Sequence, residues 1–397
     1  MNIKFSVQYD IVVAGAGIAG IAAALQAARC GKRVALLEKM ILPGGLATSG
    51  LVYIYLPLCD GNGTQVLYGL PEELLLASIA YGPGDIPPDW RKEKNAPELR
   101  RYRTVFSPAA FILALDELLE RHGVDLWYDT CVCDTVLNSE GDAVESLIVC
   151  NTSGLGRISA GCFIDASGDC SVAGKTGVDC ISEENYLSIW ALQCDRRRPA
   201  GFESDIRMYS YIEEGSERRI YRGMNGRSCS DFVVRSRRVL REYYRREQAQ
   251  LPCGRDQLYA LKLPVIPQFR KIYCITGAHV LDDGQSDWHF EDSIGLAPDW
   301  RRAGPVWEIP FRALYPEKSP GGLLVAGRCV SARNDAWEIT RVIPAAAMTG
   351  QAAGCAAALM VERGIRIPAE LNVSELQLSL RKSGVRIFRE ECGLQRS

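Results

Sequence analysis

The first forty residues alternate between strand-like and helix-like apolar segments. An apolar run at 11–14 leads into three glycines within 15–20, and the mostly apolar segment 18–30 ends before Gly31. A second apolar run occupies 33–39. Short apolar runs bounded by glycine are typical of buried strands, and longer ones are typical of helices. The pattern therefore predicts a strand, a tight turn, a helix and a second strand.

The middle of the chain predicts an irregular segment, then a helix, then a series of strands. Many Gly and Pro residues interrupt 53–103, which predicts irregular structure. A helix is then expected between Ser107, a candidate N-cap, and Gly123, a candidate stop. Polar and apolar residues alternate over 131–169, with turn residues between the runs, and this predicts antiparallel strands. The last of them, 162–167, is apolar enough to be a buried strand.

The C-terminal part predicts a strand at 323–328 and a helix that begins at Ile343 and Pro344. The segment 342–361 is long enough to span a membrane, but it is mostly alanine and contains Gly, Gln, Thr and Pro. These features favour a buried helix of a soluble protein. Residues 1–10 lack the apolar core of a signal peptide. We expect a cytoplasmic protein without membrane contact.

Composition narrows the classes of function. The net charge is −2 at pH 7, so no overall field attracts nucleic acid or an anionic membrane. The 15 cysteines include no CxxC pair, which argues against a disulfide framework and against a zinc or iron–sulfur site. The expectation is a protein of a reducing compartment with no metal site and no nucleic-acid partner.

The glycines at 15–20 form a GxGxxG sequence between the first strand and the helix. Gly15 allows the tight turn, Gly17 lets a pyrophosphate approach the backbone, and Gly20 lets the helix pack on its strand. Glu38 ends the next strand, where a carboxylate can accept hydrogen bonds from ribose hydroxyls. The chain has no second GxGxxG. These residues alone allow NAD and FAD equally.

Three separated segments resemble a known family. They read "VVAGAGIAG…LLEK" with "GGLATSG", then "FIDASGDCSVA", and finally "LLVAGRCVSARNDAWEITRVIPAAAMTGQAAGCAAALM". They resemble the FAD-dependent oxidoreductases with a glutathione-reductase-like flavin domain, related to fumarate-reductase and heterodisulfide-reductase flavoproteins. "EDSIG", "WEIPFRAL" and the segment 376–384 share this likeness, which leaves out only about 185–270. The resemblance favours FAD over NAD.

The resemblance implies an α/β fold with a discontinuous Rossmann-like FAD-binding domain of the glutathione-reductase type at 1–184 and 300–397. A smaller α+β substrate domain is expected at 185–299. The helix that begins at Ile343 would aim its positive end at the flavin. The residues implied to bind FAD are Gly15, Ala16, Gly17, Ile18, Ala19, Gly20, Glu38, Lys39, Gly45, Leu46, Ala47, Thr48, Ser49, Val132, Ala166, Ser167, Gly168, Asp169, Gly327, Arg328 and Ile343.

Several of the later glycines also have a purely structural interpretation. Gly168 and Gly327 are compatible with ordinary turns, and Gly350 and Gly354 with close packing of two helices.

The catalytic candidates are His279, His289 and Arg341. Either histidine could act as a general acid or base, although surface histidines are an equal alternative. Arg341 lies near Arg312, Arg328, Arg333 and Glu338 in the sequence, and such arginines commonly clamp a carboxylate. Pairing of these arginines within the protein is the structural alternative.

Redox cysteines are a further possibility, because dithiol-using members of this superfamily carry them near the glycine-rich loop. The loop at 44–50 has none. Cys59, Cys131, Cys133 and Cys329 are the remaining candidates, but free cysteines usually behave as small hydrophobes.

Together these features predict transfer of a hydride or electron pair between FAD and a small, anionic organic substrate. One alternative is an electron-transfer subunit of a larger redox complex. A less favoured one is a tRNA-modifying flavoprotein, suggested by the basic segment 235–248. Near-neutral net charge favours a solvated amphipathic helix there. A homo-oligomer or a redox partner protein is compatible with the sequence.

Overall fold

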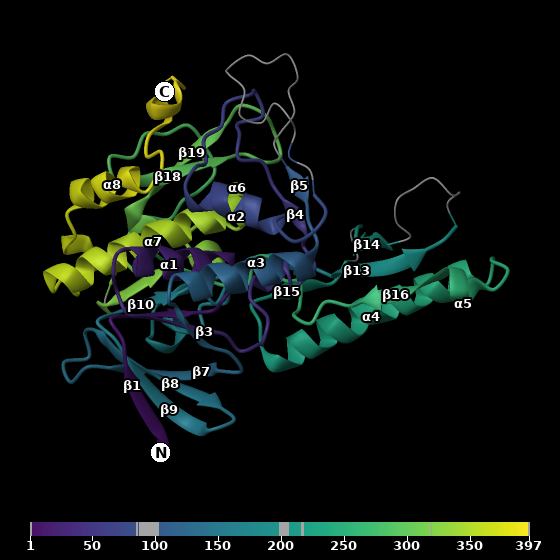
Figure 1. The fold of residues 1–397 in the computed structure, drawn as a ribbon, viewed down its shortest axis with the longest axis horizontal. Coiled ribbons are helices and arrows are strands. Elements are labelled where there is room, and N and C mark those ends of the chain that lie inside the picture. Colours follow the sequence, from purple (N-terminus) through teal and green to yellow (C-terminus); the bar gives the residue numbers. More distant parts are fainter. Residues whose placement is uncertain are drawn as a thin grey trace.

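The computed structural model describes residues 2–84, 86, 103–197, 206–215, 218–318 and 320–395 (Figure 1). Its centre is a five-stranded parallel sheet in the order β20-β10-β2-β3-β6. The strands are β20 (Leu323–Val325), β10 (Cys162–Asp165), β2 (Ile11–Ala14), β3 (Val34–Leu37) and β6 (Asp125–Trp127). Every residue of the first four is buried, as expected for a parallel sheet covered on both faces. The predicted strands and the α/β fold are confirmed.

Alternate residues of the sheet belong to two separate cores. Val13 and Leu36 pack into the larger core on the helical face, whereas Val12 and Leu37 pack into a second core. The helical face carries α1 (Ile18–Arg29), α2 (Leu70–Ser78), α3 (Pro108–Arg121) and α7 (Ile343–Arg363). The second core is closed by a sheet in the order β1-β9-β8-β7, formed by β1 (Phe5–Gln8), β9 (Gly154–Ser159), β8 (Val144–Asn151) and β7 (Cys131–Leu137). The larger body is therefore a three-layer arrangement.

Helix α7 is the core helix of this body. A Cβ at Gly350 would lie 2.1 Å from the Ala19 carbonyl oxygen, and one at Gly354 would lie 2.2 Å from that of Ala23. Only glycine allows two backbones to approach so closely, so the helix-packing interpretation of these glycines is confirmed. Helix α7 is long and apolar enough to cross a membrane, but 89% of its most apolar window is buried inside the protein. Protein therefore covers its apolar surface.

A smaller part projects from this body, on the right in Figure 1. It contains an antiparallel sheet of β14 (Ile206–Ile212), β13 (Ser188–Asp195) and β16 (Leu258–Lys262), together with α4 (Gly226–Gln248). Helix α4 buries Phe232, Ser236 and Leu240, which are four residues apart and share one face. Its arginines at 237, 238, 241, 245 and 246 are exposed. The basic segment is thus one side of an amphipathic helix.

The chain returns to the larger body through a hairpin of β18 (Ser293–Pro298) and β19 (Val306–Pro310). Strand β18 packs against α7 and α8 (Val373–Lys382). The predicted domain boundary at 299/300 falls within this hairpin, and the division into domains stays a prediction. The remaining helices and strands are β4 (Ile54–Tyr55), β5 (Thr104–Val105), β11 (Cys180–Ile181), β12 (Glu184–Tyr186), β15 (Ile220–Arg222), β17 (Cys274–Ile275), α5 (Gly254–Gln257) and α6 (Asn334–Thr340).

Candidate functional site

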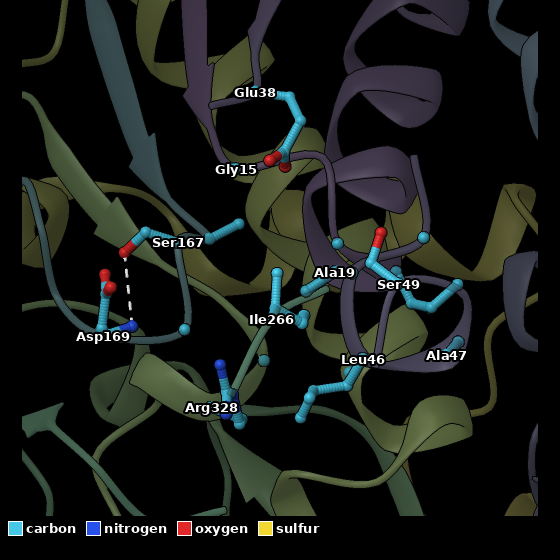
Figure 2. Close-up of a pocket in the computed structure, with 18 of the residues that line it drawn as sticks. Gly15, Ala19, Glu38, Leu46, Ala47, Ser49, Ser167, Asp169, Ile266 and Arg328 are labelled. Atoms are coloured by element: carbon cyan, nitrogen blue, oxygen red, sulfur yellow. Dashed lines mark hydrogen bonds between the residues drawn. The ribbon is translucent and has the colours of Figure 1, made fainter. Parts of the chain in front are cut away.

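A pocket opens at the carboxyl ends of β2, β3, β10 and β20, where open parallel sheets usually bind ligands (Figure 2). Its empty volume, including solvent at the mouth, is about 930 Å³, within the range of small-molecule sites. Of the residues that the sequence implied to bind FAD, those lining it are Gly15, Gly17, Ile18, Ala19, Glu38, Lys39, Gly45, Leu46, Ala47, Ser49, Ala166, Ser167, Gly168, Asp169, Gly327, Arg328 and Ile343.

The glycine-rich turn has a separate physical reason for each of its glycines. Gly15 has φ +97°, and a Cβ there would lie 2.7 Å from the Ala166 carbonyl oxygen. A Cβ at Gly20 would lie 1.8 Å from the Gly15 carbonyl oxygen, so this position sets the approach of α1 to the turn. Within the described part of the chain, and apart from Gly17 itself and its two chain neighbours, no atom lies within 4 Å of a Cβ built at Gly17. Gly17 thus leaves open space where α1 begins, and helix N-termini favour phosphate.

Glu38 lies beside this turn and is only 8% exposed. Its Oε2 accepts a hydrogen bond of 2.9 Å from the Ala16 N–H, and its Oε1 accepts one of 2.9 Å from the Met40 N–H. Burial raises the pKa of Glu38, and these two backbone donors oppose that effect. The carboxylate therefore positions the glycine-rich turn and keeps further lone pairs for a ligand that donates hydrogen bonds.

Buried Asp165 holds the opposite wall of the pocket in place. Its Oδ1 accepts hydrogen bonds from the N–H and the hydroxyl of Ser167, at 3.1 and 2.6 Å. Its Oδ2 accepts from the N–H groups of Val172 and Ala173 at 2.8 and 2.9 Å. Burial raises its pKa, and these donors offset part of that effect. Asp165 thus shapes the turn that presents Ser167 and Asp169 to the pocket.

Two polar atoms of the pocket lining have no partner within the described part of the chain. They are Ser49 Oγ and Asp169 Oδ1, and both are buried. Lys39 Nζ lies 3.7 Å from the other carboxylate oxygen of Asp169. Buried polar atoms without partners are costly unless a ligand or water satisfies them. Together with the open space at Gly17, they show that the lining suits a ligand with polar groups along its length.

The projecting part supplies one wall of the pocket. The Val265 N–H donates to the Ser49 carbonyl oxygen at 2.9 Å, and Arg328 Nη1 donates to the Phe269 carbonyl oxygen at 2.5 Å. These bonds tie 265–269 to both sides of the pocket. Figure 2 shows Ile266 between Ala19 and Arg328. The pocket is also lined by residues that were not among the predicted FAD-binding or catalytic residues, namely Met40, Leu42, Gly44, Met224, Ile266, Pro267, Ile272 and Ala346.

Arg270, Arg328 and Arg341 lie near one end of the pocket. Arg328 and Arg341 line the pocket, and Arg270 lies beside it. Arg341 Nε donates to Glu338 Oε2 at 3.0 Å. Burial acts to raise the pKa of Glu338, but Arg341 and Lys271 hold it below its ordinary value. Arg270 lines an adjoining polar pocket that also includes Glu338 and Lys271.

Unlike Arg341, Arg270 has no ion pair within the described part of the chain. Its Nη1 lies 3.4 Å from Ser188 Oγ. Burial and the nearby positive charge of Arg341 lower its pKa to about 10, and Glu338 opposes this. Since Glu338 already pairs with Arg341 and Lys271, a guanidinium remains here without a matching anion.

Four of the predicted FAD-binding residues do not line the pocket. Ala16 and Gly20 act through the turn described above. Thr48 is fully buried, and its hydroxyl donates to the Pro43 carbonyl oxygen, so it holds the 44–49 loop. Val132 lies on β7 against the second core.

The two histidines lie outside the pocket. His279 Nε2 lies 3.2 Å from Gln285 Oε1, and its ring makes an edge contact with Phe290. His289 Nδ1 lies 3.3 Å from Glu308 Oε2. The geometry brings neither histidine to the arginines, and their catalytic role stays a prediction without structural support.

Two further expectations concern metals and the other arginines. Ligand atoms of His289, Glu308 and Glu390 lie within 4.8 Å of one another. In this cluster only Glu390 is exposed; the group is apart from the pocket and does not establish a metal site. Arg312 pairs with Asp292 at 3.0 Å, and Arg333 is exposed. Of the predicted arginine group, the structure therefore brings only Arg328 and Arg341 to the pocket.

Comparison with protein families gives an extensive match. The model of a family described as FAD dependent oxidoreductase matches residues 10–185 and 183–380. A thioredoxin reductase of Ureaplasma parvum serovar 3 is 36% identical over 72 residues, which is 18% of this chain and 23% of that protein. The chain therefore spans less than a quarter of the length of this curated relative.

Solved structures are similar at a lower level. A geranylgeranyl bacteriochlorophyll reductase-like protein of Thermoplasma acidophilum aligns with 95% of this chain and 83% of its own, at 13% identity and a TM-score of 0.48. The p-nitrophenol 4-monooxygenase of Pseudomonas putida aligns with 95% of this chain and 84% of its own, at 14% identity and a TM-score of 0.47. Likenesses at this level do not bear on substrate or activity.

Proposed function

Because this chain belongs to the FAD-dependent oxidoreductase family and its cofactor is FAD, we propose that it exchanges a hydride or an electron pair between FAD and a small organic anion. When bound, FAD supplies the two-electron chemistry. The residues of the chain hold the cofactor, exclude water and orient the substrate.

The pocket suits the elongated shape and mixed polarity of FAD. Gly17 and the N-terminus of α1 would receive the pyrophosphate, and Glu38 would accept hydrogen bonds from the adenosine ribose. Ser49 Oγ and Asp169 Oδ1 would gain the partners they lack. Ile343 begins α7 at the arginine end of the pocket, and the positive end of that helix favours a negatively charged group.

The observation that carries the proposed anionic substrate is the arginine group. Glu338 pairs with Arg341, and Lys271 pairs with both Glu183 and Glu338, so Arg270 is left partly buried beside another guanidinium. Burying a charge without a partner is costly, and a substrate carboxylate or similar anion would offset that cost. Arg341 and Arg270 are the candidate clamp because arginine binds carboxylates through two parallel hydrogen bonds.

The test is an anaerobic screen of metabolites that follows bleaching of the bound flavin. The best substrate is then tested with Arg270→Gln and Arg341→Gln, and Arg333→Gln serves as the matched exposed control. Loss of a hydrogen bond to a charged group costs about 1.5–3 kcal/mol, so each pocket variant should lose roughly 10- to 100-fold in kcat/KM. The control should keep wild-type values.

Two results would contradict the proposal. The first is a screen in which neutral metabolites bleach the flavin and anionic ones do not. The second is an unchanged kcat/KM for an anionic substrate in both pocket variants. Copurification of iron–sulfur subunits, with no metabolite able to reduce the flavin, would favour the electron-transfer alternative.

A further inference from the structure

A polar seam runs between α1, α7 and α8 inside the otherwise apolar core. Gln26 is 3% exposed and Gln351 is 1% exposed. Gln351 Nε2 donates to Gln26 Oε1 at 3.1 Å. The Gln26 amide in turn donates to Ser383 Oγ at 3.2 Å and to Cys30 Sγ at 3.5 Å. The seam is therefore a connected network that reaches a thiol at the end of α1.

Two cysteines meet one helical turn beyond the glutamines. Cys30 follows Gln26 by four residues and Cys355 follows Gln351 by four, so each shares a face with its glutamine. The helices run side by side with their backbones close together, since a Cβ at Gly354 would lie 2.2 Å from the Ala23 carbonyl oxygen. Gln26 Nε2 joins Cys30 to this network and Cys355 Sγ lies 3.2 Å from Ser379 Oγ, and Cys355 is the neighbour that most affects the pKa of Cys30. Both thiols are free.

The surroundings of Cys30 favour its thiolate. The Cys355 thiol lowers the pKa of Cys30 to about 6, burial opposes this, and Gln26 and Lys32 assist. Lys32 is itself 3.6 Å from Glu362, which acts in the opposite direction. The helix dipole at the C-terminal end of α1 also disfavours an anion. The combined effect of Cys355, Gln26 and Lys32 must therefore exceed that of the dipole.

Other cysteines provide an internal comparison. Cys30 is partly exposed, whereas Cys355 is buried and its pKa is raised because its thiol donates to Cys30. Cys133 is more exposed than Cys30, yet burial of its sulfur and the neighbouring Cys131 and Cys150 raise its pKa. Reactivity of a thiol depends on its thiolate fraction as well as on access. The Cys30 thiol is therefore partly exposed to solvent and also has a lowered pKa.

We propose that Cys30 and Cys355 form a dithiol–disulfide site that a hydroperoxide such as hydrogen peroxide oxidises. The Cys30 thiolate attacks one peroxide oxygen, the O–O bond breaks, and hydroxide leaves, which makes Cys30 a sulfenic acid. The Cys355 sulfur then attacks the Cys30 sulfur, and the S–O bond breaks. The departing hydroxyl takes the Cys355 proton and leaves as water. Two sulfurs lose one electron each, and the peroxide gains both.

The disulfide would join two helices that begin at the pocket. Ile18 starts α1, Ile343 starts α7, and both residues line the pocket. The site thus places a reversible covalent link between the C-terminal end of α1 and the middle of α7, the two helices whose N-termini would hold the cofactor. A dithiol reductant would restore the free thiols by exchange.

The first experiment uses the wild-type holoprotein. Iodoacetamide labelling across pH 5–9, read by peptide mass spectrometry, should give a Cys30 rate with a midpoint near pH 6, and Cys30 should react faster than Cys133 at pH 7. Hydrogen peroxide should then produce a cross-linked Cys30–Cys355 peptide that has lost two hydrogens, and dithiothreitol should reverse the cross-link.

Three variants separate the steps. Cys355→Ser should leave Cys30 as a sulfenic acid that dimedone traps, and Cys30→Ser should leave Cys355 unoxidised. Cys133→Ser should cross-link as the wild type does. A Cys30 labelling rate at pH 7 no faster than that of Cys133 would overturn the proposal. So would the absence of a Cys30–Cys355 peptide after peroxide treatment of the wild type, which requires no substitution to fold.

Discussion

Glu38 is the residue whose side chain positions the glycine-rich turn and would also bind the cofactor. Glu38→Gln removes the charge from the acceptor that would face the ribose, and such hydrogen bonds contribute about 1.5–3 kcal/mol. We expect FAD to bind roughly 10- to 100-fold more weakly at pH 7. Flavin fluorescence titration of the apoprotein measures this, with exposed Glu140→Gln as the control. Unchanged FAD affinity would show that the ribose is held elsewhere.

The raised pKa of Glu38 adds a pH dependence. FAD needs the ionised acceptor, so affinity should fall as the pH drops from 7 and should already decline above the ordinary glutamate pKa of about 4.3. For folding the sign is opposite: a carboxyl with a raised pKa favours the fold below its ordinary pKa, and this contribution is lost as the pH rises through the raised value. Glu38→Gln should show a flatter FAD-affinity profile than the wild type.

Replacing Arg270 should weaken substrate binding without lowering the stability of the substrate-free protein. Its lowered pKa means that the fold disfavours its charged form, which at neutral pH is a cost. Arg270→Met keeps the apolar stem and removes the charge, so the substrate-free protein should have an equal or higher Tm. The substrate identified by the flavin-bleaching screen should bind more weakly. Calorimetry and substrate titration test the two halves, and a large fall in Tm would show that Arg270 is a structural residue.

At the scale of elements, two glycines of the glycine-rich turn should have different roles: Gly17 in cofactor binding and Gly20 in folding. Gly17→Ala places a methyl in open space, so the Tm of the apoprotein should stay near wild type while FAD affinity falls. Gly20→Ala places a methyl against the Gly15 carbonyl oxygen, and overpacking of this kind costs about 1–3 kcal/mol or more. It should therefore lower the apoprotein's Tm. Equal effects of both variants on Tm would contradict this division.

Local pattern was enough to predict β2, α1, β3, α3, β10 and α7, because each is specified by its own apolar run and its own glycine, proline or cap. The pocket wall at 265–272 was not predictable in this way. Its position depends on bonds such as that between Val265 and Ser49, which join residues far apart in the sequence. The special character of Arg270 is likewise a product of burial, which a sequence pattern does not reveal.

The two candidate histidines were predicted as site residues but lie outside the pocket. His279 and His289 were chosen for their chemistry and for their place just before the return to the flavin domain. Tertiary packing instead places them beside Phe290 and Glu308, outside the pocket. Side-chain chemistry in a sequence identifies candidates, but only the fold decides which of them share a site.

At the scale of the whole molecule, the described residues contain one five-stranded parallel sheet with one dinucleotide turn. FAD would occupy that turn, so a nicotinamide donor has no second fold to hold it. We expect no saturable flavin reduction at micromolar NADH in anaerobic stopped-flow measurements, while dithionite bleaches the same flavin. Rapid reduction that saturates in this range would require a nicotinamide site elsewhere.

The central claim is that this pocket holds FAD along its whole length. The most direct test is to measure the affinity of the apoprotein for FAD and for FMN side by side. The adenosine half of FAD adds the pyrophosphate at Gly17 and the ribose at Glu38, and hydrogen bonds to charged groups contribute about 1.5–3 kcal/mol each. FAD should therefore bind roughly 100-fold or more tightly than FMN. Equal affinity for the two flavins, or an apoprotein that neither flavin reconstitutes, would contradict the account.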